Sequence, residues 1–254
     1  MMASVTAYAE YARFYDQANG DRSADSERIR SYVRRYRPGA SSLLELGCGT
    51  GAVLAGLAGD MAVTGIDRSP EMLAIANRTV PAARLERADI RAFDLATRFD
   101  VAICVFDTLN HLTTLDDWLA LFDRVRDHLT EGGLFVFDVN TTGRLRRLGM
   151  GPPFAADLDE HALVMDVRPA AATESDNEDR GGELWMWTVR VFERIDGDLF
   201  RLHREDIPEL GVPLTAVRQG LADRGFEVLE MTGLDGEPGT DDSSRVFVAA
   251  RVTA

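Results

Sequence analysis

The sequence predicts an α/β protein built on a parallel sheet with helices on both faces. Short apolar runs alternate with amphipathic segments between residues 26 and 140, which is typical of this class. In the segment 43–51, Leu-Leu-Glu-Leu-Gly-Cys-Gly-Thr-Gly, an apolar run meets three glycines where a strand would turn into a helix. Asp67 ends the next apolar run, twenty positions after the first of those glycines.

The parallel strands are short apolar runs bounded by turn residues. The run over 99–106 is almost entirely apolar, which indicates a strand buried on both faces. The sequence Glu131-Gly132-Gly133 predicts a turn ahead of the fifth strand. In chain order, the strands are expected at 43–46, 62–67, 83–86, 99–106 and 134–139.

The helices show apolar residues three and four positions apart. Ser69 and Pro70 suit the N-cap and the first position of the third of them, and Thr114 suits the cap of the fourth. Pro38 and Gly39 end the first helix. In chain order, the helices are expected at 26–37, 52–57, 71–79, 115–129 and 213–224.

After residue 140 the pattern changes from alternating strand and helix to antiparallel strands. Asp196-Gly197 is a hairpin signal that joins two strands expected at 184–192 and 198–204. A further strand is expected at 162–168, and the acidic segment 173–179 is expected to be mobile. We interpret residues 143–206 as an antiparallel insertion on the substrate side of a single domain, 1–254. The last two strands are expected at 226–231 and 246–250.

Composition excludes several functional classes. The chain has 254 residues and a net charge of −14, and all 28 basic residues are Arg. Without Lys there is no Schiff-base chemistry, and the negative charge argues against nucleic acid as a partner. No apolar run reaches the length of a membrane span, and two cysteines do not make a disulfide framework. These features predict a reduced, cytoplasmic monomer or homodimer without a membrane partner.

The glycine loop has two interpretations. A dinucleotide site would need Gly-x-Gly-x-x-Gly and a pyrophosphate on the helix N-terminus. Here the loop reads Gly47-x-Gly49-x-Gly51 and follows Glu45, whose carboxylate disfavours a diphosphate but tolerates a cationic ligand. With Asp67 at its spacing, this motif resembles that of the class I S-adenosylmethionine (SAM)-dependent methyltransferases. The resemblance implies SAM as the cofactor and a Rossmann-like seven-stranded sheet with an antiparallel β insertion after strand five.

The resemblance also implies where the cofactor binds, at the carboxyl ends of the strands. In the family, the glycine loop lines the methionine part, and the acid after the second strand binds the ribose. An acid and the residue after it hold the adenine, and the backbone after the fourth strand accepts from the ammonium group. The implied cofactor residues are Glu45, Gly47, Cys48, Gly49, Gly51, Asp67, Arg68, Met72, Asp89, Ile90, Val105 and Phe106.

Candidates for catalysis lie beyond the fourth strand and near the N-terminus. The segment from Phe106 to Leu112 resembles the equivalent segment of amino-sugar N,N-dimethyltransferases. His111 within it either acts on the acceptor, as a group that titrates near pH 7, or caps its loop. Tyr11 and Tyr15 either approach the cofactor or substrate or pack on the core. The acceptor-binding candidates are Asp107, Asn110, Asn140, Trp185 and His203.

The sequence therefore predicts methyl transfer to a small-molecule acceptor, with nitrogen slightly favoured over oxygen. No metal is expected, because the sequence shows no clustered ligand set. Three alternatives remain: a SAM-using enzyme of other chemistry, such as a cyclase; a SAM-binding protein without turnover; and a tRNA methyltransferase. The acidic charge disfavours the last of these.

Overall fold

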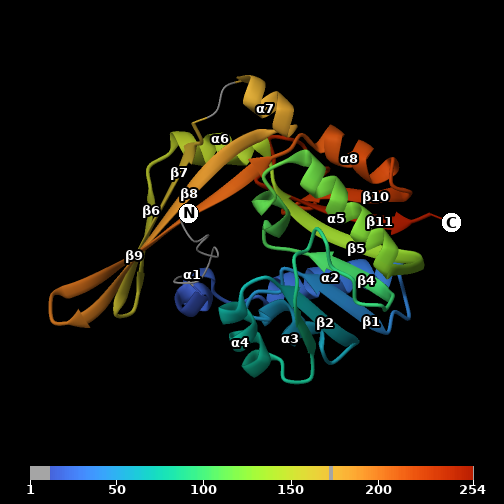
Figure 1. Cartoon of the computed structure of the whole chain (residues 1–254), viewed down its shortest axis with the longest axis horizontal. Coiled ribbons are helices and arrows are strands. Elements are labelled where there is room, and N and C mark those ends of the chain that lie inside the picture. The colour runs from blue at the N-terminus through green and yellow to red at the C-terminus, as the bar shows by residue number, and fades with distance from the viewer. Residues whose placement is uncertain (1–11, 172–173, 254) are drawn as a thin grey trace.

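The computed structural model describes residues 12–171 and 174–253, which form two sheets (Figure 1). The larger sheet has seven strands in the order β10-β11-β5-β4-β1-β2-β3. Strands β1 to β5 are parallel, and β11 runs antiparallel to both β5 and β10. Its strands are β1 Ser42–Leu46, β2 Ala62–Asp67, β3 Arg84–Arg87, β4 Phe99–Cys104, β5 Leu129–Asn140, β10 Phe226–Gly233 and β11 Arg245–Val252. The predicted seven-stranded sheet is confirmed.

Helices cover both faces of this sheet, and successive residues of each strand face opposite layers. On β1, Leu43 packs with residues of α2 and α3, whereas Leu44 packs in the cluster that contains Trp118 of α5. This alternation follows from the two-residue period of a strand. The helices of these layers are α2 Ser23–Tyr36, α3 Ala52–Leu57, α4 Pro70–Thr79, α5 Leu115–His128 and α8 Leu214–Ala222. None of the helices in the described residues is long and apolar enough to cross a membrane.

The chain between β5 and α8 forms a second, antiparallel sheet in the order β6-β7-β8-β9. Figure 1 shows it beside the larger sheet, with the β8–β9 hairpin reaching away from the body. Its strands and helices are α6 Thr142–Met150, β6 Phe154–Leu158, β7 His161–Pro169, α7 Glu174–Arg180, β8 Glu183–Asp196 and β9 Leu199–Gly211. The predicted antiparallel insertion is therefore present, and β9 continues past residue 206.

Two local expectations were wrong. The acidic segment expected to be mobile forms α7, which has Arg180 in its last turn and ends at Gly181 with φ 73°. A cation in the last turn and a left-handed glycine both favour a helix C-terminus. The turn expected at 131–133 lies inside β5, where the register with β4 shifts between Phe99 and Val101.

The short N-terminal helices lie against the second sheet. They are η1 Ala12–Phe14 and α1 Tyr15–Asn19. Phe14 is buried in a cluster with Val189 and Ile207, and Tyr15 packs against that cluster. Thr50 of the glycine loop donates a hydrogen bond to Asp16 (2.7 Å). These contacts hold α1 between the second sheet and the carboxyl edge of the larger one.

Candidate active site

Two cavities lie side by side at the carboxyl edge of the parallel strands. The first, about 290 Å³, is lined by the glycine loop, the end of β2 and the loop after β3. The second, about 210 Å³, lies between that edge and the second sheet. Both are lined by Tyr15, Phe106, His111 and Ile207. A ligand in one cavity can therefore reach a ligand in the other.

The glycine loop and Asp67 form the centre of the first cavity. Gly47, Gly49 and Gly51 have φ values of 68°, 52° and 78°, a region that glycine adopts without steric cost. The Asp67 carboxylate accepts hydrogen bonds from the backbone N–H groups of Gly49 (2.9 Å) and Ser69 (2.8 Å). Burial raises the pKa of Asp67, and the two N–H groups oppose that rise. An oriented carboxylate of this kind suits the hydroxyl groups of a ribose.

Apolar side chains line the other end of the first cavity. Met72 of α4, Ala88 and Ile90 suit one face of an adenine ring. Asp89 also lines this end, where the guanidinium of Arg91 donates to it (2.7 Å) and lowers its pKa. Arg68 lines the same cavity. The residues present at both ends of the cavity therefore fit SAM.

Glu45 and Cys48 lie beneath the glycine loop rather than at the cavity wall. Glu45 is 3% exposed, and its Oε2 has no hydrogen-bond partner among the described residues. Burial, and then the charge of Asp67, raise its pKa well above the ordinary value. Burial likewise raises the pKa of the Cys48 thiol far above its usual range. A thiol held neutral in this way is a packing group and not a nucleophile.

The loop after β4 has a strained backbone that is fixed by Asp138. Phe106 and Asp107 have φ values of 62° and 48°, which are unusual for residues other than glycine. Their N–H groups donate to the buried Asp138 carboxylate (3.0 and 2.8 Å), which also pairs with Arg245. Each such conformation costs on the order of 1–3 kcal/mol and persists where its surroundings impose it. The strain sets the direction in which Asp107 leaves the backbone.

Two guanidinium groups lie over the ring of Phe106. The Cζ atoms of Arg22 and Arg245 are 3.4 and 4.6 Å from the ring centroid. Within the part of the chain that the structure describes, Arg22 Nη2 is buried without a hydrogen-bond partner. Arg22 lines neither cavity, and it acts on the site through the ring of Phe106, which lines both. No motif in the sequence points to Arg22, because only the fold brings it to this loop.

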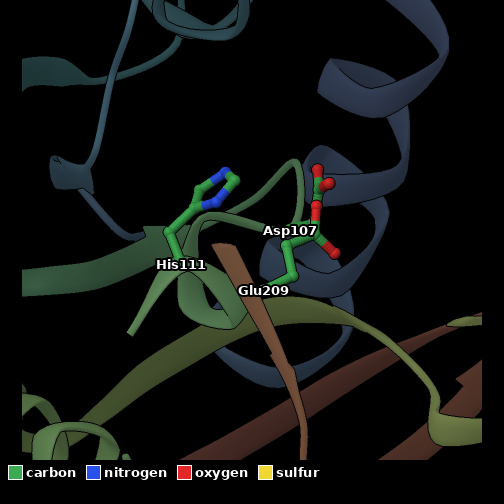
Figure 2. Close-up of side chains that lie close together, drawn as sticks. All are labelled: Asp107, His111 and Glu209. Atoms are coloured by element: carbon green, nitrogen blue, oxygen red, sulfur yellow. The ribbon is translucent and has the colours of Figure 1, made fainter. Parts of the chain in front are cut away.

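The second cavity contains a pair of carboxyl groups beside an imidazole. Figure 2 shows the carboxyl groups of Asp107 and Glu209 facing each other next to the His111 ring. One ring nitrogen of His111 and one carboxylate oxygen each of Asp107 and Glu209 lie within 4.8 Å of one another. The amide of Asn140 donates to Glu209 (2.9 Å) and to Asp107 (3.1 Å). Glu209 was missed by sequence reasoning, because its strand was expected to end at residue 204.

His111 lies at the junction of the two cavities. It belongs to η2, Thr108–His111, and its Nδ1 is 3.4 Å from the carbonyl oxygen of Pro208. Burial lowers the pKa of His111, and the negative charge of Asp107 opposes that shift. The lowered pKa favours the neutral imidazole, which is the form that can accept a proton. The structure brings His111, Asp107, Asn140 and Tyr15 together in the second cavity.

Other candidates lie away from both cavities. Asn110 is 0% exposed, and its amide joins η2 to the backbone carbonyls of Asn140 and Leu210. Trp185 packs with Leu145 and Val167, and its strand neighbour Trp187 lines the second cavity instead.

Three further candidates complete the set. His203 lies outside both cavities, and its Nε2 is 2.8 Å from Oε2 of Glu193. The carbonyl of the buried Val105 accepts from Thr108 (2.8 Å). Tyr11 lies outside the described residues.

Comparisons with known proteins agree with this geometry. A family model described as a methyltransferase domain matches residues 43–133. A putative methyltransferase from Geobacillus sp. (strain WCH70) is 26% identical over 253 residues, which cover 96% of this chain and 99% of that protein. The dTDP-3-amino-3,6-dideoxy-alpha-D-glucopyranose N,N-dimethyltransferase of Streptomyces fradiae is 36% identical over 134 residues, 51% of this chain and 52% of that enzyme.

A solved structure extends the likeness to the fold of the whole chain. The SAM-dependent methyltransferase from Clostridium acetobutylicum ATCC 824 superposes with a TM-score of 0.82 at 24% identity, covering 97% of this chain and 99% of that one. Residues 43–133 thus match a methyltransferase domain, the whole chain has the fold of a SAM-dependent methyltransferase, and SAM is its cofactor. Within that class it resembles the amino-sugar N,N-dimethyltransferases, although the chain spans only about half the length of the relative from Streptomyces fradiae.

Proposed function

We propose that this enzyme transfers the methyl group of SAM to a nitrogen atom of a small molecule. The observation that carries the proposal is the second cavity, which adjoins the cofactor cavity and holds His111 beside Asp107 and Glu209. SAM supplies the methyl group on a sulfonium. The protein binds the acceptor, aligns its nitrogen with the methyl group and removes a proton. Alignment of this kind can contribute roughly 7–11 kcal/mol of the barrier.

We propose an amino sugar as the acceptor class. The relative from Streptomyces fradiae acts, by its name, on the amino group of a dTDP-linked sugar. The match covers 134 residues of this chain, and the second cavity, about 210 Å³, is large enough for a sugar-sized molecule. Nitrogen is preferred over oxygen because a carboxyl pair in the acceptor cavity suits a cation better than a neutral hydroxyl.

A labelling experiment tests the proposed function. Incubation with methyl-labelled SAM and the dTDP-amino sugar named for the relative is expected to give a labelled N-methyl product and equimolar S-adenosylhomocysteine. Release of methylthioadenosine would instead indicate a SAM-using enzyme of the cyclase type. Tight SAM binding without either product, with cell extract as a source of acceptors, would indicate a SAM-binding protein.

Nucleic acid is expected not to be the acceptor. The net charge is −14, and phosphate neutralisation is the main source of nucleic-acid affinity. In an anisotropy titration at physiological salt, tRNA and duplex DNA are expected to show no saturable binding. Saturable tRNA binding with a steep salt dependence would support a tRNA methyltransferase and contradict this prediction.

We also propose that the enzyme works in the reducing environment of the cytoplasm. Cys48 and Cys104 are both free and buried. Burial raises the pKa of each thiol, so neither is poised for oxidation.

A further inference from the structure

We propose that the Asp107–Glu209 pair binds the acceptor's amino group in its charged form, so that the acceptor is an oxygen-bearing amine that enters as an ammonium ion. The inference rests on the proposed function and names the substrate class of the same site. It assigns to Glu209 a role in specificity.

The geometry of the pair suits an ammonium group. Glu209 reaches the cavity from β9, and Asp107 reaches it from the strained loop after β4. Glu209 is 2% exposed, and Asn140 donates to both side chains. The pair is therefore fixed in place before a ligand arrives. An ammonium group has several N–H donors, which suit two carboxyl groups that face each other.

The carboxyl pair is the negative part of a cavity wall that also contains two Arg residues. Arg245 also lines the cavity, but its charge is matched by Asp138 and by Asp25 (3.5 Å). Arg144 is the other cation of the wall. Burial, and then the charge of Asp107, raise the pKa of Glu209 well above the ordinary value. Two facing carboxylates resist joint ionisation, and a bound cation removes that resistance.

Two further donors on the same wall indicate oxygen atoms in the ligand. Among the described residues, Trp187 Nε1 and Arg144 Nε are buried without a hydrogen-bond partner. Both residues line the second cavity. A buried N–H without a partner costs free energy, which a ligand oxygen would recover. Hydroxyl or phosphate oxygens beside the amino group would provide those acceptors.

A divalent metal ion is the competing occupant, because His111, Asp107 and Glu209 could each supply one ligand atom. The rest of the cavity favours an organic amine. Its wall includes Tyr15 and Trp187, together with the apolar side chains Met165, Val189 and Ile207. Such a wall suits a small molecule and contributes nothing to holding a bare ion.

The test compares two sugars that differ by one group, D-glucosamine and D-glucose. Each is titrated into the full chain saturated with S-adenosylhomocysteine, and affinity is measured by ligand-observed NMR. The wild-type protein is expected to bind glucosamine roughly 10-fold or more tightly than glucose, the effect of a charge-assisted hydrogen bond. The variants Glu209→Gln and Asp107→Asn are expected to lose that preference. The control Glu227→Gln, at an exposed position on β10, is expected to keep it.

Three results would overturn the inference. These are equal affinity for the two sugars, no binding of glucosamine, and a Glu209→Gln protein that still prefers the amine. A Mn²⁺ titration is run on the same proteins. Mn²⁺ binding that Glu209→Gln abolishes, with no preference for the amine, would identify a metal site instead. Melting temperature and S-adenosylhomocysteine affinity show whether each variant is folded.

The binding experiment is independent of turnover, so the two proposals can fail separately. A protein that prefers glucosamine through Glu209 but methylates no amine would contradict the proposed function alone. A protein that methylates an amine but binds the two sugars equally would contradict the present inference alone.

Discussion

Replacing His111 with Ala is expected to lower the single-turnover rate of methyl transfer by about 10²–10⁴-fold, the usual contribution of a positioned general base. SAM affinity is expected to change little, because Asp67 and the glycine loop remain intact. The physical reason is the position of His111. It lines both cavities, and its ring lies near the carboxyl groups of Asp107 and Glu209. The effect is measured by single-turnover kinetics with labelled SAM and an amine that the wild-type enzyme methylates.

The pH dependence adds a second readout for His111. Burial lowers its pKa in the folded protein, so the neutral base is present at pH 7 and above. The rate is expected to be flat there and to fall as the pH drops below the usual range of histidine. The unfolded chain binds that proton more readily, so the contribution of His111 to stability is also lost as the pH falls through its folded pKa.

The alternative role of His111 is to cap its loop. A capping histidine predicts a lower melting temperature for His111→Ala with an unchanged rate per folded molecule. The matched control is His161→Ala, on β7 and outside both cavities. Normal turnover in a folded His111→Ala protein would contradict the catalytic role.

Replacing Asp67 with Ala is expected to weaken SAM and S-adenosylhomocysteine binding by roughly 1.5–3 kcal/mol, or about 10- to 150-fold. The Asp67 carboxylate lines the cofactor cavity and is oriented by Gly49 and Ser69. Its loss removes charge-assisted hydrogen bonds to the ribose hydroxyls. Titration calorimetry with both ligands measures the change.

Asp67 also holds the glycine loop through its hydrogen bond from Gly49. A second variant therefore separates the loss of the ribose contact from a change in the loop. Asp67→Asn keeps the size of the side chain and one acceptor oxygen, and it is expected to bind SAM with intermediate affinity. Asp60→Ala, at an exposed position paired with Arg30, is the control and is expected to bind like the wild type. An Asp67→Ala protein that folds normally and binds SAM as tightly as the wild type would rule out the assignment.

The cofactor half of the site could be predicted from the sequence because its signals are local. The glycine loop, Asp67 and the pair Asp89 and Ile90 each follow an apolar run that reads as a strand, and parallel strands bring their carboxyl ends to one edge. The first cavity is lined by Gly47, Gly49, Asp67 and both residues of that pair.

The acceptor half could be predicted only in part. Asp107, Asn140 and His111 follow strand ends, and all three line the second cavity. Glu209 lies late in β9 and reaches that cavity only through the pairing of β9 with β8. Arg22 comes to Phe106 from the start of α2, a contact that no short motif records. The α7 helix was missed because acidic composition concealed the helix end at Arg180 and Gly181.

The two cavities draw their walls from different parts of the chain. The first cavity is lined mainly by loops of the parallel sheet, whereas the second takes Trp187 and Glu209 from the β8–β9 hairpin. The methyltransferase family match ends at residue 133, before that hairpin begins. A substitution on the hairpin can therefore reshape the second cavity while the glycine loop and Asp67 keep their geometry.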